Sequence, residues 1–453
     1  MRQPEESRAK IYRILIPHPL VAAKRRAVSN NGQKGKEGVF MNNGKLNRFF
    51  IVMLVFIPVF VLIHGFPGNQ AAAADNEIII GGSIPLSGAA AETGRNVYNG
   101  YQAAIKYVNE VYGGVKVGGE TYKLKLKMFD DASDPSRATT LIQRQLDEGV
   151  DFFLGSFGSK IVLPTCSITE RAKKPMVQSG GGSDLIFTKG RKFVFGIFPR
   201  ASRQFYTFRD FYKKLGDIKS FTIMYTNRPF SKWLAGGAQK TLEASGFKII
   251  DVHQLPAQVN DASSVLASVR ANPPDVLLSI THDGTSMLIA KQMVTTNTYV
   301  KMLYFGLGPQ TVAFRETLGK YGNEITTAVY WDEGASYKGT IIGSAQNFAD
   351  FYRKNFKRSL TYHMGSGGAC IVAYVHAIQN ADSLDPIKVR DALDALDTMS
   401  FYGRLKFTPD GDAEAEYAGP IVAQVKEGKM ELIYPESAAT TKTVYPMTPW
   451  GKR

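Results

Sequence analysis

Two turns rich in glycine and serine carry the residues of this chain best suited to hold a ligand. The first, Phe157-Gly158-Ser159, follows the apolar run 151–154 and precedes a helical pattern. If Ser159 is the N-cap of that helix, its hydroxyl satisfies one amide of the first turn, and the other amides near 160–162 stay unpaired. These amides and the helix dipole attract a carboxylate or phosphate, and glycine lets the ligand approach the backbone.

A second turn of the same kind follows one unit later. It reads Gly180-Gly181-Gly182-Ser183 and comes after the apolar run 175–178. Either turn alone is also typical of an ordinary connection between a strand and a helix. Because two of them follow each other, the pattern favours a ligand site.

His282 and Asp283 follow a predicted strand end and are the residues that most resemble a catalytic pair. No nucleophile stands at the spacing that this chemistry needs, and the sequence lacks the G-x-S-x-G, HExxH and P-loop patterns. A role in a turn is therefore favoured, and we expect no enzymatic activity. His363 and His376 lack the spacing of metal ligands, so no metal and no cofactor is predicted.

Charge and cysteine content narrow the possible functions. The formal net charge is +15, but the first 74 residues hold 11 Lys and Arg against 3 Asp and Glu, so +7 belongs to the remainder. That remainder has no run of basic residues interleaved with aromatic ones, which argues against nucleic-acid binding. Cys166 and Cys370 each fall in an apolar helical pattern and are expected to be buried and not to form a disulfide framework.

The N-terminal segment has the pattern of a secretory signal peptide. Residues 49–63 form an apolar run broken by Pro58, with basic residues before it and four alanines after it. This pattern predicts export to the periplasm with cleavage near Ala74, and a signal anchor is the alternative. Met41 opens a signal peptide of ordinary length, 41–74, so we expect 1–40 to be untranslated or disordered.

Strands and helices alternate along the rest of the chain, and the alternation restarts near residue 220. Strict β-α-β alternation predicts parallel sheets with helices on both faces, and in such sheets a ligand binds beyond the carboxyl ends of the strands. The predicted strands are 77–84, 122–129, 151–154, 175–178, 192–197, 220–225, 248–254, 276–280 and 300–305.

The length that remains after residue 74 is too great for one core, so two domains are expected. The predicted fold class is α/β, with two doubly wound parallel-sheet lobes joined by a three-crossing hinge. Changes of pattern near 198–202, 306–309 and 401–403 are the predicted crossings. Lobe 1 then comprises 75–198 and 308–400, and lobe 2 comprises 199–307 and 401–453.

Five segments resemble the leucine/isoleucine/valine-type periplasmic binding proteins that feed ABC transporters. They are 84–88 (IPLSG), 130–135 (DDASDP), 153–159 (FLGSFGS), 261–278 and 403–411 (GRLKFTPDG). The resemblance implies a type I periplasmic-binding-protein fold: a monomer that closes on a small ligand and docks on a membrane permease. A ligand-sensing protein is an alternative with the same fold, which we would expect to carry an attached membrane helix or signalling domain.

The resemblance also implies where the ligand lies in the first lobe. The family serine that holds an amino acid carboxylate falls on Ser159, and the backbone groups of the next turn fall on Gly180 and Gly181. The family threonine of that turn falls on Gly182, so its hydroxyl is missing unless Ser183 supplies one.

The second lobe decides the ligand class. The resemblance implies that the aromatic residue that closes over the ligand falls on Phe230, and that the acidic partner of the ligand ammonium falls on or near Thr285. We expect the ligand to be an amino acid, with Asp283 in place of that acid; the alternative is an aromatic acid, an amide or another carboxylate. The segment Tyr330-Trp331-Asp332 is either an aromatic wall of the site or a strand end packed against the lobe, and Trp331 is its member placed in the ligand-binding set. The predicted ligand-binding set is Thr93, Phe157, Gly158, Ser159, Gly180, Gly181, Gly182, Ser183, Phe230, His282, Asp283, Thr285 and Trp331.

Overall fold

The fold was analysed in a computed structural model, which describes residues 76–416 and 418–453. The predicted signal peptide, 41–74, and the segment 1–40 lie outside the described residues.

The first lobe is built on a six-stranded sheet in the order β2-β3-β1-β4-β5-β6. Neighbouring strands are parallel except for the hairpin of β2 and β3. The central strands β4 and β5 are buried throughout because helices cover both faces of the sheet, which explains their continuous apolar sequence. The strands are β1 Glu77–Ile84, β2 Val115–Val117, β3 Glu120–Asp130, β4 Phe152–Leu154, β5 Met176–Gln178 and β6 Val194–Gly196.

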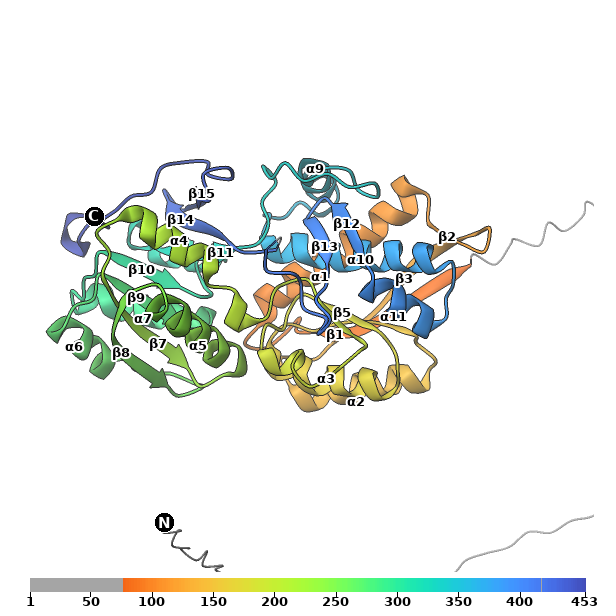
Figure 1. The fold of residues 1–453 in the computed structure, drawn as a ribbon, viewed down its shortest axis with the longest axis horizontal. Coiled ribbons are helices and arrows are strands. Elements are labelled where there is room, and N and C mark those ends of the chain that lie inside the picture. Colours follow the sequence, from red (N-terminus) through yellow and green to blue (C-terminus); the bar gives the residue numbers. More distant parts are fainter. Residues whose placement is uncertain (1–75, 417) are drawn as a thin grey trace, which may run out of the picture. The chain divides into compact units, whose positions relative to one another are not determined.

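Helices cover both faces of this sheet (Figure 1). On one face α10 packs against α1, α11 and β5, and on the other α2 packs against α3 and β1. Cys166 of α3 and Cys370 of α10 are both buried and free, as predicted. The helices are α1 Ala91–Tyr107, α2 Pro135–Asp147, α3 Ser159–Arg171, α9 Ala345–Phe356, α10 Tyr362–Ala381 and α11 Pro386–Asp394, and a π-helical turn Val108–Tyr112 extends α1.

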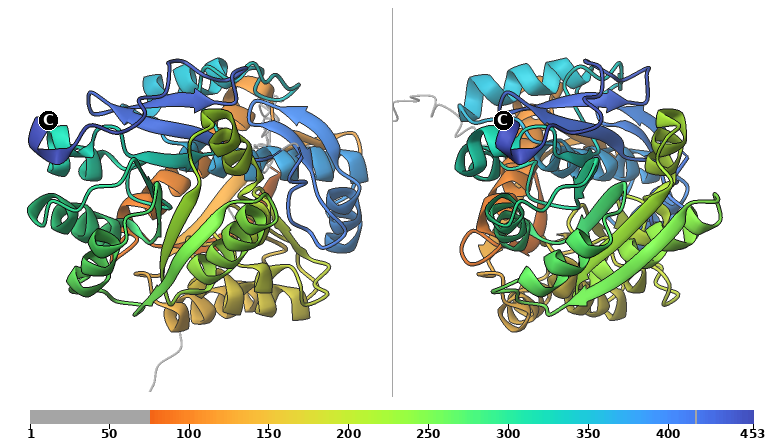
Figure 2. Two further views of the ribbon diagram at one scale, coloured as in Figure 1. Left: turned by 60° about the vertical axis from the view of Figure 1, so that its left-hand side comes forward. Right: turned by 90° about the vertical axis from the view of Figure 1, so that its left-hand side faces the viewer.

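The second lobe has a seven-stranded sheet in the order β15-β14-β11-β10-β9-β7-β8. Strands β7 to β11 are parallel, and β14 and β15 extend the sheet as antiparallel edge strands. Figure 2 turns this lobe and the C-terminus toward the viewer. The strands are β7 Ser220–Thr226, β8 Lys248–Leu255, β9 Val276–Ile280, β10 Met302–Phe305, β11 Thr326–Val329, β14 Ile421–Lys426 and β15 Lys429–Tyr434.

Two separate clusters of buried side chains lie on the two faces of the second sheet. Side chains of α4 and α5 contribute to one cluster, for example Phe208 and Leu234. Those of α6, α7 and α8 contribute to the other, together with Trp450 near the C-terminus. The helices are α4 Tyr206–Leu215, α5 Pro229–Glu243, α6 Ser263–Ala271, α7 Asp283–Thr295 and α8 Val312–Leu318.

Both sheets share one strand order. The parallel strands lie in the order β3-β1-β4-β5-β6 in the first sheet and β8-β7-β9-β10-β11 in the second. In each sheet the strand that comes next in the chain after β1 or β7 in this series lies on one side of it, and the following three strands lie on the other side. The order therefore reverses between β1 and β4 in one lobe and between β7 and β9 in the other, and ligands bind at such switch points. The predicted α/β class with two doubly wound lobes is confirmed.

Two of the three crossings lie elsewhere than the sequence predicts. Strand β11 still belongs to the second sheet, so the chain returns after Val329 and not at 306–309. That glycine- and proline-rich segment is a tight turn into α8, where a Cβ on Gly308 would lie 3.0 Å from Phe314.

The third crossing lies after the β12–β13 hairpin and not at 401–403. Strands β12 (Asp397–Ser400) and β13 (Gly403–Lys406) form a hairpin of their own, and Phe407 packs on Phe195 of β6 with ring centroids 5.2 Å apart. The crossing follows Asp412, which forms a β-bridge with Gly196, and β14 then joins the second sheet. Local composition marks a turn, but it does not tell which sheet the next strand joins.

A buried ion pair ties the first crossing to the third. The Arg200 side chain donates to both Asp412 oxygens, at 2.7 and 3.1 Å, and its backbone N–H donates to the same carboxylate at 2.9 Å. The Asp412 side chain is fully buried and also accepts from the Thr408 hydroxyl at 2.6 Å. Burial alone would raise the pKa of Asp412, but the hydrogen bonds from Arg200 and Thr408 hold it below its usual value.

We predict that Asp412→Ala lowers the free energy of unfolding by about 3 kcal/mol, because it leaves the Arg200 guanidinium buried without its main partner. Urea titration followed by circular dichroism measures the change. Asp410→Ala is the matched control: Asp410 binds the same guanidinium at 2.7 Å but is 52% exposed, so its loss should cost less than about 1 kcal/mol. Equal small losses for both variants would show that the buried pair does not stabilise the hinge.

Candidate functional site

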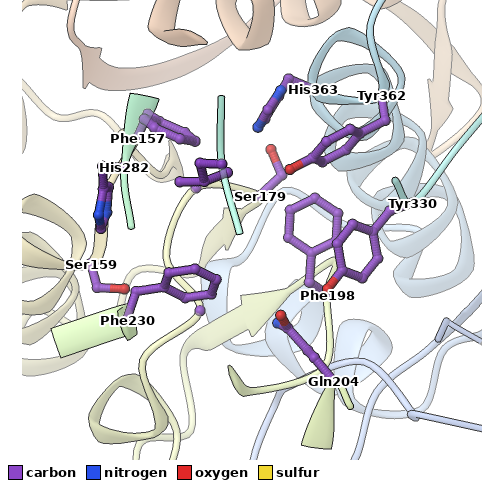
Figure 3. A pocket seen from close by; sticks show the side chains of 14 residues that line it. Phe157, Ser159, Ser179, Phe198, Gln204, Phe230, His282, Tyr330, Tyr362 and His363 are labelled. Carbon is purple, nitrogen blue, oxygen red and sulfur yellow. The ribbon is translucent and has the colours of Figure 1, made fainter. Parts of the chain in front are cut away.

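A cavity lies at the carboxyl ends of the two sheets, between the lobes (Figure 3). Its volume is about 50 Å³. By this measure one water molecule needs roughly 10–15 Å³, so a small solute can enter. The lining residues are Phe157, Gly158, Ser159, Ser179, Gly180, Gly182, Phe198, Gln204, Phe230, His282, Leu307, Tyr330, Tyr362 and His363.

The turn after β4 begins helix α3 at this cavity. Gly158, with φ 97°, is the N-cap, and Ser159 is the first helical residue, so the expectation that Ser159 is the N-cap is wrong. The left-handed backbone that the turn requires is one that glycine adopts without strain and serine does not. The amides of Ile161 and Val162 both donate to the Gly158 carbonyl. The amides of Ser159 and Lys160 are therefore the ones at this helix end without an acceptor within the helix.

The two glycine turns are joined by hydrogen bonds. Gly158 N–H donates to the Gly180 carbonyl at 2.9 Å, and Ser183 N–H donates to the Ser159 hydroxyl at 3.0 Å. Because the Ser159 oxygen accepts from Ser183, its own O–H is left to donate into the cavity. This hydroxyl and the first amides of α3 are hydrogen-bond donors of the kind that suits a carboxylate, and the group of them is called the carboxylate seat below.

The sequence predicts that backbone groups of Gly180 and Gly181 bind the ligand, but in the structure the amides of both residues stabilise the turn. Both amides donate to the Gln178 side-chain oxygen, at 3.0 and 2.6 Å. A Cβ on Gly180 would lie 2.0 Å from the Ser156 carbonyl oxygen, so this close approach requires glycine. Gly180 and Gly182 line the cavity, whereas Gly181 and Ser183 do not.

Aromatic rings form most of the remaining wall. The centroid distances among Phe198, Tyr330 and Tyr362 are 4.5, 5.5 and 6.0 Å. Phe157 and His363 are 5.4 Å apart, and Phe230 and His282 are 6.2 Å apart, both pairs nearly perpendicular. Such edge-to-face arrangements suit the quadrupoles of the rings.

The aromatic wall predicted at Trp331 is formed by its neighbour Tyr330. Successive residues of an extended chain point to opposite sides, so when Tyr330 faces the cavity Trp331 faces away. The Trp331 indole is buried, packs edge to face against Phe348 and Phe401, and donates to the Phe401 carbonyl at 3.2 Å. It does not line this cavity.

The cavity carries no formal charge at neutral pH. Burial lowers the pKa of His282 and of His363 to about 3, and the nearby Arg228 contributes at His282. Both imidazoles are therefore neutral. The lining residues include no Asp, Glu, Lys or Arg.

Asp283, Thr93 and Thr285 lie outside the cavity lining. The Thr93 hydroxyl at the start of α1 donates to the Asp283 carboxylate at the start of α7, at 3.1 Å, and so links the two lobes. Burial raises the pKa of Asp283 to about 6; Glu92 adds to this effect, and Thr93 and Arg228 oppose it. Thr93 and Asp283 thus form a contact between the lobes.

Sequence reasoning found Phe157, Gly158, Ser159, Gly180, Gly182, Phe230 and His282, all of which line the cavity. It missed half of the lining. Tyr362 and His363 enter from the start of α10, about two hundred residues after the first glycine turn, and no local pattern marks them. The lining residues absent from the predicted ligand-binding set are Ser179, Phe198, Gln204, Leu307, Tyr330, Tyr362 and His363, of which Tyr330 lies in the segment predicted as a possible aromatic wall.

Two doubly wound lobes, three crossings and a cavity between the lobes are the architecture of proteins that bind small solutes between two domains. The sequence matches the periplasmic binding protein family over residues 77–429, and the chain belongs to that family. The predicted resemblance and the type I fold are confirmed. Within the part of the chain that the structure describes, no helix has the length and apolar character needed to cross a membrane.

Several known proteins are similar to this chain. Leu/Ile/Val-binding protein homolog 8 of Brucella abortus (strain 2308) is 25% identical over 395 residues, which cover 82% of this chain and 93% of that protein. The leucine binding protein LivK of Thermotoga maritima has a TM-score of 0.70 at 21% identity and covers 79% of this chain and 98% of its own. A solute binding protein of R. palustris, solved with benzoate, has a TM-score of 0.65 at 17% identity and covers 81% of this chain and 100% of its own.

We predict that Gly182→Ala weakens solute binding about tenfold or more, on the scale of about 1–3 kcal/mol for overpacking. A Cβ at position 182 would lie 2.8 Å from the Phe230 ring, across the contact between the lobes. Isothermal titration with any solute that the wild-type protein binds measures the loss. Phe230→Leu should restore part of the affinity in the double variant.

Gly236→Ala is the matched control for this change. Gly236 lies on the same helix as Phe230, α5, but a Cβ there would meet no atom within 4 Å. Its affinity should equal that of the wild type. Equal affinities for all the variants would mean that the Gly182–Phe230 contact plays no part in binding.

Proposed function

We propose that this protein is an extracytoplasmic solute-binding protein that captures a small organic carboxylate between its lobes and delivers it to the permease of an ABC transporter. The observation that carries the proposal is the carboxylate seat formed by the Ser159 hydroxyl and the first amides of α3, which faces a largely aromatic cavity at the switch points of both sheets. We further propose that it acts in the periplasm as a monomer without a nucleic-acid partner.

Delivery to a permease requires that the loaded form differ in shape from the empty one. The lobes are connected by only three crossings, so hinge rotation supplies that difference while each lobe stays nearly rigid. Family membership supports this role, because periplasmic binding proteins are binding proteins and not a class of enzymes.

The names of similar proteins support two classes of carboxylate as the ligand. The Brucella abortus relative is named for leucine, isoleucine and valine, and the Thermotoga maritima structure is a leucine binding protein. These names support an amino acid. The structure solved with benzoate supports an aromatic acid.

The proposed function is tested by titrating the purified protein with amino acids, aromatic acids, aliphatic acids, amides and dicarboxylates in a calorimeter. We expect at least one monocarboxylate to bind at micromolar affinity or better and to reduce the radius of gyration measured by X-ray scattering. If no carboxylate binds, the proposed function is wrong. Binding with an unchanged radius of gyration would contradict closure of the lobes.

We predict that Ser159→Ala weakens binding of that carboxylate by about 1–2 kcal/mol, the scale of one charge-assisted hydrogen bond. Ser136→Ala is the control, since Ser136 occupies the first turn of another helix, α2, and is exposed. Calorimetric dissociation constants compare the two variants. If both variants keep the wild-type affinity, the carboxylate does not bind at Ser159.

A further inference from the structure

We propose that the ligand is an aromatic monocarboxylate that carries no ammonium group. This inference rests on the proposed function, which supplies the carboxylate, and adds what the rest of the solute must be. It follows from three properties of the described residues: the charge of the cavity, the nature of its wall and the placement of its spare hydrogen-bonding group.

The charge of the cavity excludes an ammonium group. A buried ammonium needs a carboxylate partner, because it loses its hydration when the lobes close. No lining residue is acidic, and the nearest candidate from the sequence, Asp283, lies outside the lining with its carboxylate bonded to Thr93. The two lining histidines are neutral and supply no negative charge. An α-amino acid would thus have its carboxylate satisfied, whereas its ammonium would have no carboxylate partner and only neutral acceptors such as Gln204.

The wall of the cavity suits a ring. Five aromatic side chains and two neutral imidazoles surround the space, and only Leu307 adds an aliphatic surface. The cluster of Phe198, Tyr330 and Tyr362 already has centroid distances in the range that aromatic pairs prefer, so a further ring can add to it edge to face. An aliphatic side chain would gain from burial alone.

A second donor is available to the carboxylate. The Nδ1 atom of His282 is buried and has no hydrogen-bond partner among residues 76–416 and 418–453. A neutral imidazole can donate from one nitrogen, so His282 can bind one carboxylate oxygen while Ser159 and the α3 amides bind the other. In Figure 3, His282 and Ser159 lie on the same side of the cavity.

Aromatic faces also attract cations, so a solute with a quaternary ammonium is the alternative occupant. A ring acid is favoured because the wall has no acidic residue to complete the pairing of a cation. Glycine betaine, which carries a carboxylate and a quaternary ammonium, distinguishes the two.

The test is calorimetric titration of the purified protein at pH 7.4 with matched pairs of solutes. 3-Phenylpropionate and phenylalanine share a ring and a carboxylate, but only phenylalanine carries an ammonium. 4-Methylpentanoate and leucine form the corresponding pair with an aliphatic side chain in place of the ring. We expect each acid to bind at least about 30-fold more tightly than its amino counterpart, and 3-phenylpropionate or benzoate about tenfold more tightly than 4-methylpentanoate. Tighter binding of phenylalanine, leucine or glycine betaine would overturn the inference but leave the proposed function standing. If none of these solutes binds, the inference is overturned; the proposed function is overturned as well only if no carboxylate of the wider set binds.

Two variants and one control variant test which residues cause the preference for aromatic acids. Tyr330→Leu should lower the affinity for ring acids about fivefold or more and change that for 4-methylpentanoate less than about twofold. Tyr206→Leu, at an exposed tyrosine of the second lobe, should change neither. Asp283→Asn keeps an oxygen that can accept from Thr93, so it should leave the affinity for ring acids within about twofold. A loss of about 30-fold on Asp283→Asn, or equal losses for both acids on Tyr330→Leu, would contradict the inference.

Discussion

The strand order of the two sheets is the constraint on which the site depends. Because the order reverses between β1 and β4 and between β7 and β9, the segments after these strands leave toward opposite faces and open a crevice at each point. The turn after β4 supplies Ser159, the segment after β7 supplies Phe230, and the segment after β9 supplies His282. The two crevices meet in one cavity, which is lined by residues that follow strands of both sheets.

Close packing of helices places the rest of the site. Helices α1 and α10 pack closely at two glycines. A Cβ on Gly100 of α1 would lie 2.1 Å from a backbone oxygen of α10, and a Cβ on Gly367 of α10 would lie 2.4 Å from a backbone oxygen of α1. The start of α10 is thereby fixed beside the first sheet, which brings Tyr362 and His363 into the cavity. The aromatic wall thus depends on glycines that never touch the ligand space.

The sequence predicts the features that depend on neighbouring residues, and it fails for those that depend on contacts between distant segments of the chain. The alternation of strands and helices and the two glycine turns depend on nearby residues, and these were found. Composition predicts the return to lobe 1 at 306–309 because turns and crossings share the same composition. The sequence marks Tyr330-Trp331 as a possible aromatic wall but does not tell which ring faces the site, because a shift of one residue along an extended chain reverses the side. Serine is a common N-cap, so the sequence suggests Ser159, whereas the left-handed backbone at Gly158 is a property of the folded turn.

The charges near the site are arranged so that the cavity itself stays neutral. Asp283 and Thr93 form their contact between the lobes beside the cavity, and Glu92 and Arg228 are close enough to affect the pKa of Asp283. Inside, the carboxylate seat uses partial charges from a hydroxyl and backbone amides, whose effect is larger in a medium of low polarity than in water. A solute with one negative group is then compensated, whereas each further charge must be desolvated without a partner. For the proposed ligand, the neutral wall disfavours further charged groups by the cost of burying them, and the donors of the seat suit its single carboxylate.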